Sequence, residues 1–236
     1  MKYIAVGKQI KTLEINEDKL INREGYAKLY ELNKDKCAKV YYEPVSIKDR
    51  KDIKTVIKKI RSLDIDCMYK IYELLYNNQN LAFSGYTRDI INGTPLSNMT
   101  PEIAEKLMSM SSEEAMELLI RLEYAKNTLS NNGIYISDDI YSGIIVHDNT
   151  FTIGNVDRYL YRPNQREKII VENDQLINLI ETMTIIRAAT ILNYPENDKM
   201  KVVKNCREIF GNNRNVLANK LETLSKEKTL KKTLLK

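Results

Sequence analysis

Residues 133 to 157 of this chain read GIYISDDIYSGIIVHDNTFTIGNVD. The stretch contains two short apolar runs, Ile144–Val146 and Phe151–Ile153, and the polar residues His147-Asp148-Asn149 separate them. Two apolar runs joined by a polar turn are typical of a β-hairpin. The segments before and after the stretch show helical periodicity, so the sequence predicts a hairpin within a mainly helical half of the chain.

Helix caps precede the hairpin. Thr100-Pro101-Glu102 offers an N-cap, a proline at the first helical position and an acid in the first turn. Ser111 and Glu114 have the spacing of a capping box. They open an amphipathic pattern that Gly133 is suited to end in a left-handed conformation. Helical patterns return after the hairpin over residues 175–192 and 199–210.

The first part of the chain shows strand signals instead. Three short segments rich in β-branched, aromatic and aliphatic residues are separated by turn residues, which predicts a three-stranded antiparallel meander. These segments are Leu20–Arg23, Ala27–Leu32 and Cys37–Tyr42. A helical pattern over Ile47–Leu63 and two more strands, Tyr69–Leu75 and Leu81–Tyr86, come next.

A turn cluster, Asn92-Gly93-Thr94-Pro95, follows the last of these strands. We expect it to divide the chain into a sheet-containing lobe over 1–92 and a helical lobe over 93–236. The helical lobe would hold the hairpin region 134–157 and a terminal segment over 220–236. The fold class expected is α+β.

Composition excludes several kinds of site. The three cysteines are scattered and the chain has a single histidine, so a disulfide framework, a zinc site or a histidine triad has little to be built from. No apolar run approaches the roughly 18 residues that a membrane span needs. The first residues, MKYIAVGKQIK, lack a cleavage pattern, so we expect no signal peptide and a cytoplasmic location.

The positive net charge of +5 is concentrated at the end of the chain. Residues 220–236 contain six lysines against two glutamates. A solvated helix end is the favoured interpretation of this segment. The alternative is a basic arm for nucleic acid or an anionic surface.

The order of these features resembles a protein kinase: strands, one helix, more strands, a glycine-containing connection, then helices interrupted by one hairpin. The resemblance covers roughly residues 20 to 195 and implies a two-lobed protein-kinase-like fold, with a small antiparallel-sheet lobe and a mostly helical lobe. Glu24–Tyr30 is similar to the nucleotide loop, although Gly25 is its one glycine. Residues 133–157 are similar to the catalytic loop, the strand pair after it and the metal-binding motif.

The resemblance implies a nucleotide site in the first lobe. Lys39 would pair with the α- and β-phosphates of ATP. Cys37 lies on the same strand face and would cover the adenine. The backbone at Asp89 and Ile91, in the connection between the lobes, would bond the adenine edge.

Carried over to the second lobe, the resemblance also implies what is missing. Asp138 takes the place of the catalytic aspartate. Gly143 stands where the family has a metal-binding asparagine, and Asn155 stands where it has the metal-binding aspartate. A neutral amide is a poorer Mg²⁺ ligand than a carboxylate, so Mg²⁺ binding is doubtful. Asp157 is a candidate replacement ligand.

Two further departures from the kinase pattern concern the acidic partner of Lys39 and the peptide-binding platform. No glutamate occurs between Glu43 and Glu73, which leaves only Asp49 or Asp52 to pair with Lys39 from the first helix. The segment from Asp157 to Asp174, where we expect the next long helix to begin, is too short for the peptide platform of a protein kinase. Asp174 resembles the acid that braces the catalytic loop, although a helix N-cap is the commoner role for such an aspartate.

These departures favour a pseudokinase, which would act through nucleotide binding, through an unidentified protein partner, or both, with weak or no Mg²⁺-dependent phosphoryl transfer. The alternative is an active atypical phosphotransferase, acting on Ser/Thr or on a small molecule, with Asp138 as base and Asp157 as metal ligand. ATP is the cofactor implied in either case.

Overall fold

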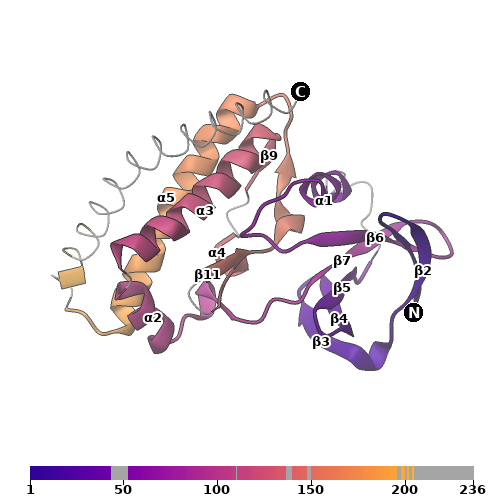
Figure 1. Ribbon diagram of the computed structural model, residues 1–236, viewed down its shortest axis with the longest axis horizontal. Helices are drawn as coiled ribbons and strands as arrows, with labels where there is room; N and C mark the ends of the chain where they lie inside the picture. The colour runs from indigo at the N-terminus through magenta and orange to yellow at the C-terminus, as the bar shows by residue number, and fades with distance from the viewer. Residues whose placement is uncertain are drawn as a thin grey trace, which may run out of the picture. The chain divides into compact units, whose positions relative to one another are not determined.

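The computed structural model describes residues 1–43, 53–109, 111–136, 140–147 and 150–195, together with 198, 199, 201 and 204. The fold is α+β, with a large antiparallel sheet (Figure 1). The strands are β1 (Lys2–Val6), β2 (Ile10–Glu14), β3 (Leu20–Glu24), β4 (Ala27–Asn33), β5 (Lys36–Tyr41), β6 (Ile71–Asn77), β7 (Phe83–Asp89), β8 (Thr94–Pro95), β9 (Ile134–Tyr135), β10 (Ile144–His147), β11 (Thr150–Ile153) and β12 (Leu160–Tyr161). The helices are α1 (Ile53–Arg61), α2 (Pro101–Met108), α3 (Ser112–Asn131), α4 (Ile140–Gly143) and α5 (Arg166–Ile191), with short 3-10 turns η1 (Glu17–Lys19), η2 (Leu96–Asn98) and η3 (Val156–Arg158).

The chain forms two compact units. The first comprises Met1–Leu96 and Ala125–Leu176, and the second comprises Ser97–Tyr124 and Ile177–Lys236. The lobe boundary expected between residues 92 and 93 stays a prediction.

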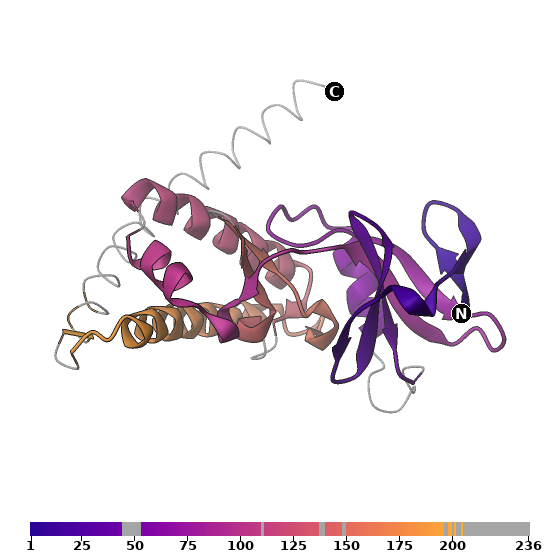
Figure 2. The same cartoon turned by 90° about the horizontal axis from the view of Figure 1, so that it is seen from below.

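The first unit is built on a seven-stranded sheet in the order β2-β1-β6-β7-β5-β4-β3. The meander predicted from the sequence is confirmed, because β3, β4 and β5 pair in antiparallel fashion. The two later strands are also present, as β6 and β7. Sequence reasoning assigned no elements to the β1–β2 hairpin, which extends the sheet beyond β6 (Figure 2). The part of the first helical pattern that the structure describes is α1.

Strand alternation separates the two faces of this sheet. Ala38 and Val40 of β5 point into an apolar cluster with Tyr30 and Leu75. Lys39, which lies between them in β5, therefore points to the other face. Helix α1 buries its own apolar stripe and packs against β6, β12 and η3. This packing places η3, and Asp157 within it, next to the sheet.

The predicted hairpin, the capping box at Ser111 and the left-handed Gly133 are confirmed. Strands β10 and β11 pair with Ile144 opposite Ile153. Ser111 and Glu114 form the reciprocal capping box, with bonds of 2.8 and 3.2 Å. Gly133 has a φ of +71°, the left-handed conformation expected of it.

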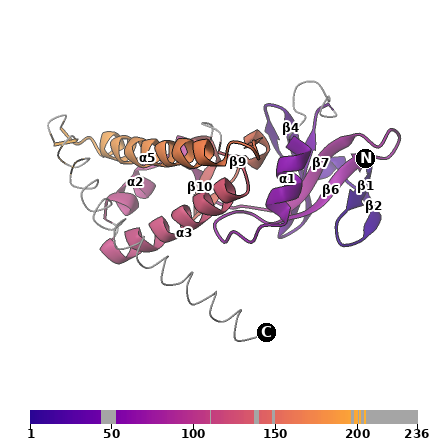
Figure 3. The same cartoon turned by 90° about the horizontal axis from the view of Figure 1, so that it is seen from above.

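The start of the last long helix was predicted wrongly. Helix α5 begins at Arg166, so Asp174 lies within it and caps no helix. The polar run around Asp174 looked like a helix start, but it lies inside α5, which Figure 3 shows as one unbroken helix. Asp174 pairs there with Lys126 of α3. Tertiary contacts therefore explain the interruption of the apolar pattern. The segment between Asp157 and the helix is shorter than expected.

The second unit contains α2, the part of α3 up to Tyr124 and the part of α5 from Ile177 onward. Thr100 caps α2, as predicted, and accepts a bond from the amide of Ile103 at 3.4 Å. Arg187 of α5 donates to the carbonyl of Ser97 at 2.6 Å. Among the described residues, no helix combines the length and apolarity needed to cross a membrane. The basic segment 220–236 lies outside the described residues.

Candidate functional site

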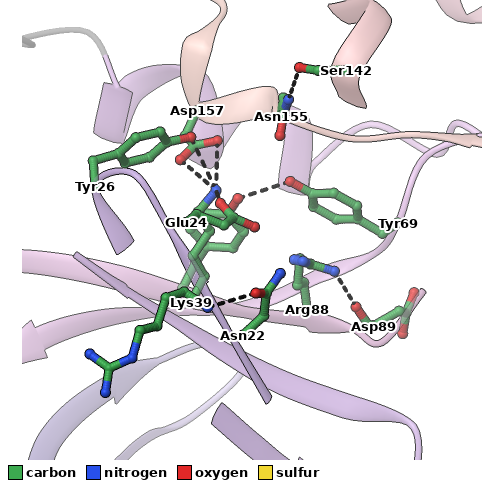
Figure 4. Close-up of polar contacts among 12 residues, drawn as sticks. Asn22, Glu24, Tyr26, Lys39, Tyr69, Arg88, Asp89, Ser142, Asn155 and Asp157 are labelled. Atoms are coloured by element: carbon green, nitrogen blue, oxygen red, sulfur yellow. Dashed lines mark hydrogen bonds and ion pairs between the residues drawn. The ribbon is translucent and has the colours of Figure 1, made fainter. Parts of the chain in front are cut away.

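Lys39 lies at the centre of a buried polar cluster in the first unit, and its side chain is 2% exposed. Its Nζ lies 2.5 Å from Oε2 of Glu24 and 3.0 Å from Oδ2 of Asp157. It also donates to Oδ1 of Asp157 and to the Tyr26 hydroxyl, each at 3.2 Å (Figure 4). The structure thus brings together two of the residues singled out in the sequence, Lys39 and Asp157. It adds two that were missed as polar partners, Glu24 and Tyr26.

The sheet holds Lys39 in place from both sides. In the register of β5 it stands opposite Leu29 of β4 and Tyr86 of β7. Gly85 of β7 has a φ of +151°, and a Cβ there would lie 1.9 Å from the Lys39 carbonyl oxygen. Only glycine permits this close approach of the two strands. The base of the Lys39 side chain is therefore fixed by the backbone.

A tight turn over Gly25 and Tyr26 joins β3 to β4 and carries Glu24 and Tyr26 over Lys39. A Cβ at Gly25 would meet nothing within 4 Å. Gly25 is also absent from the residues with positive φ. Neither packing nor backbone conformation therefore demands glycine at position 25.

The charges in this cluster compensate one another. Burial by itself lowers the pKa of Lys39, but the carboxylates of Asp157 and Glu24 raise it, and the net pKa lies above the ordinary value for lysine. The ammonium group is therefore charged at neutral pH. Asp157 is 3% exposed, so its carboxylate depends on Lys39 for compensation.

Tyr26 covers the cluster with its ring. Its centroid lies 4.8 Å from Nζ of Lys39 and 4.9 Å from Cζ of Arg158, which are cation–π distances. Burial and the nearby Asp157 carboxylate raise the pKa of Tyr26, so its phenol is neutral. The turn between β3 and β4 is thus tied to both Lys39 and η3.

The residue at the expected metal position points elsewhere. Asn155 has a φ of +53° and donates through Nδ2 to Oγ of Ser142 at 3.0 Å. A Cβ at Gly143 would lie 2.9 Å from Cβ of Asn155. The Asn155 side chain therefore occupies the space into which a side chain at 143 would project. In Figure 4, Asn155 faces Ser142 whereas Asp157 faces Lys39.

Within the described part of the chain, no cluster of three or more histidine, cysteine, aspartate or glutamate residues could hold a metal ion. Asp138, the candidate base, lies outside the described residues, as do Asp49 and Asp52. Among the described residues, the carboxylates that pair with Lys39 are those of Glu24 and Asp157. The expectation of a partner limited to the first helix missed Glu24, because nothing in the sequence between β3 and β5 signals this ion pair.

The remaining candidates lie at the end of β7. Asp89 accepts from the amide of Lys70 at 2.8 Å and from the hydroxyl of Tyr72 at 2.6 Å. The Cys37 thiol, whose pKa burial raises, donates to the Asp89 carbonyl at 3.7 Å. Ile91 follows the strand in an irregular segment and is partly buried. Cys37 and Asp89 are thus in contact.

Asn173 of α5 braces the segment that precedes Asp138. It is fully buried, and its Oδ1 accepts from the amide of Ile136 at 2.9 Å. Its Nδ2 donates to Oγ of Ser130 and to the carbonyl of Ile134, at 2.8 and 3.1 Å. The sequence suggested Asp174 for this contact. The structure gives it to Asn173, one residue earlier.

No protein-family model matches this chain, and a search of curated proteins returns no match.

Proposed function

We propose that this chain is a kinase-like domain of the pseudokinase type, which transfers little or no phosphate and acts by binding a protein partner. The carrying observation is that Asn155 and Gly143, at the two positions where the resemblance implies metal ligands, offer no carboxylate. Lys39, by contrast, has two carboxylate partners, Glu24 and Asp157. A lysine paired with a carboxylate is part of a kinase site, so this cluster supports the kinase-like half of the proposal.

The surroundings of Asn155 support the same proposal. Phosphoryl transfer depends on Mg²⁺ held between carboxylate and phosphate oxygens. Asn155 contributes an amide that is bonded to Ser142, and Gly143 contributes no ligand atom. The carboxylate of Asp157 would have to leave Lys39 before it could serve a metal ion. Each of these features weakens the metal clamp on which catalysis rests.

The order of elements supports the kinase-like architecture. An antiparallel sheet carries Lys39, one helix is inserted between β5 and β6, and a hairpin follows α3. The strand pair β10–β11 leads directly into η3 and Asp157. Asn173 holds the backbone just before Asp138 from a long helix, which is the kind of bracing that the resemblance implies for that loop.

Mg²⁺-dependent turnover of ATP tests the proposal. We expect the full chain to release phosphate from Mg²⁺–ATP no faster than the Asp138→Ala variant, with circular dichroism as the control for folding. Turnover that is well above background, and that Asp138→Ala abolishes, would refute the pseudokinase. That result would favour the alternative, an atypical phosphotransferase with Asp138 as base and Asp157 as metal ligand.

A further inference from the structure

Arg88 is a buried cation on the same sheet as Lys39. It lies in β7 and is 8% exposed. The register places it opposite Cys37, two residues from the pair formed by Tyr86 and Lys39. Since alternate residues of a strand share a face, Arg88 and Lys39 point to the same side of the sheet. This is the side on which the nucleotide would lie.

The Arg88 guanidinium is held at the end of β7. Its Nη1 donates to the carbonyl of Asp89 at 2.8 Å. Its Cζ lies 4.6 Å from the centroid of the Tyr69 ring. Tyr69 is itself fixed by a 2.9 Å hydrogen bond between its hydroxyl and that of Tyr86. Figure 4 shows Arg88 between Tyr69 and Asp89, below the Lys39 cluster.

The carbonyl of Asp89 is fully used. A backbone carbonyl oxygen has two lone pairs. One accepts from Arg88 and the other from the Cys37 thiol, at 2.8 and 3.7 Å. The next amide is also used, because Ile90 donates to the carbonyl of Asp35 at 2.9 Å. An amino group that approached this backbone from a ligand would have to displace Arg88 or Cys37.

A guanidinium can replace an aminopurine at such a place. It is planar, stacks on aromatic faces and donates hydrogen bonds within its own plane. The amino group and ring of adenine offer the same three properties. Arg88 lies within cation–π distance of the Tyr69 ring and donates one hydrogen bond to the Asp89 carbonyl. It does so from within the chain and without the entropy cost of binding a ligand.

We propose that the Arg88 side chain occupies the place of the nucleotide base and closes the domain to adenine compounds. The inference rests on the proposed kinase-like function, since the resemblance identifies the backbone at Asp89 as the base-binding edge. The inference also makes the proposed pseudokinase function more specific, because the domain would then act through its protein partner without a bound nucleotide. Removal of the guanidinium frees one lone pair of the Asp89 carbonyl and the face of Tyr69.

Adenosine is the probe of choice because it lacks phosphates and therefore leaves the Lys39 cluster out of the measurement. Calorimetric titration of the full chain compares the wild type with Arg88→Ala and with Arg88→Thr, whose β-branched side chain suits a strand. Arg61→Ala is the matched control, because Arg61 also donates to a backbone carbonyl, that of Val6, at 2.8 Å. Circular dichroism establishes which variants are folded.

We expect a folded Arg88 variant to bind adenosine at least about tenfold more tightly than the wild type, which corresponds to about 1.4 kcal/mol. The Arg61→Ala variant should behave like the wild type. Equal affinity of the wild type and the Arg88 variants would overturn the inference, and so would folded Arg88 variants that bind no adenosine. Neither result bears on phosphate transfer, which the turnover of Mg²⁺–ATP tests separately.

Discussion

Substitution Lys39→Met removes the ammonium group that lies between the carboxylates of Glu24 and Asp157. The two acids differ in exposure, since the Glu24 side chain is 26% exposed whereas that of Asp157 is fully buried. Glu24 can turn toward water, but Asp157 cannot do so without moving η3. The substitution therefore leaves a buried carboxylate without its compensating charge.

Breaking a buried ion pair on one side typically costs about 3–5 kcal/mol of unfolding free energy. We expect Lys39→Met to fall in that range at neutral pH. The matched control is Lys2→Met, because Lys2 pairs with Glu14 at 3.9 Å with both side chains exposed. Such a surface pair contributes about 0–1 kcal/mol.

Urea unfolding followed by circular dichroism measures both losses. A loss no larger than that of Lys2→Met would refute the compensation argument.

Two further predictions concern ionisation and metal binding. Burial raises the pKa of Tyr69 to about 12 and holds the pKa values of Tyr86 and Tyr159 well above the ordinary value. A raised pKa favours the folded state while the phenol is neutral, so this stability is complete below about pH 10 and is lost at higher pH. Ultraviolet titration should show these phenols ionising only as the chain unfolds. Ionisation of the three phenols near the ordinary pKa while the chain is still folded would contradict this prediction. Substitution Gly143→Asn supplies the ligand type that the kinase resemblance implies at this position, yet its Cβ would crowd Asn155. We therefore expect calorimetry to detect no gain in Mg²⁺ affinity, and we expect a stability loss of about 1–3 kcal/mol that Gly143→Ala shares. Tight Mg²⁺ binding by Gly143→Asn alone would contradict that expectation.

Local signals made much of the fold predictable. The capping box at Ser111, the left-handed Gly133 and the β10–β11 hairpin each depend on residues within a few positions of one another. Side-chain identity and spacing determine such features, so they can be read from the sequence alone. The β3–β4–β5 meander was predictable for the same reason.

Long-range contacts account for what the sequence did not show. Glu24 contacts Lys39 because the turn at Gly25 reverses the chain between β3 and β4, and β4 in turn pairs with β5. Asn173 contacts Ile136, which lies 37 positions earlier in the chain. Neither pairing leaves a periodic trace. From the sequence, Asp174 was the more obvious candidate for bracing the segment before Asp138, because a charged residue suggests function more readily than a neutral amide does.

The Lys39 cluster and Arg88 act on different parts of the same expected ligand. Glu24, with its partly exposed carboxylate beside Lys39, would repel a polyphosphate that approached. Arg88 occupies the backbone edge that the base would need. Because one barrier is electrostatic and the other is a matter of space and hydrogen bonds, removing either leaves the other in place. We therefore expect nucleotide binding with phosphate-dependent affinity only when both Arg88 and Glu24 are changed.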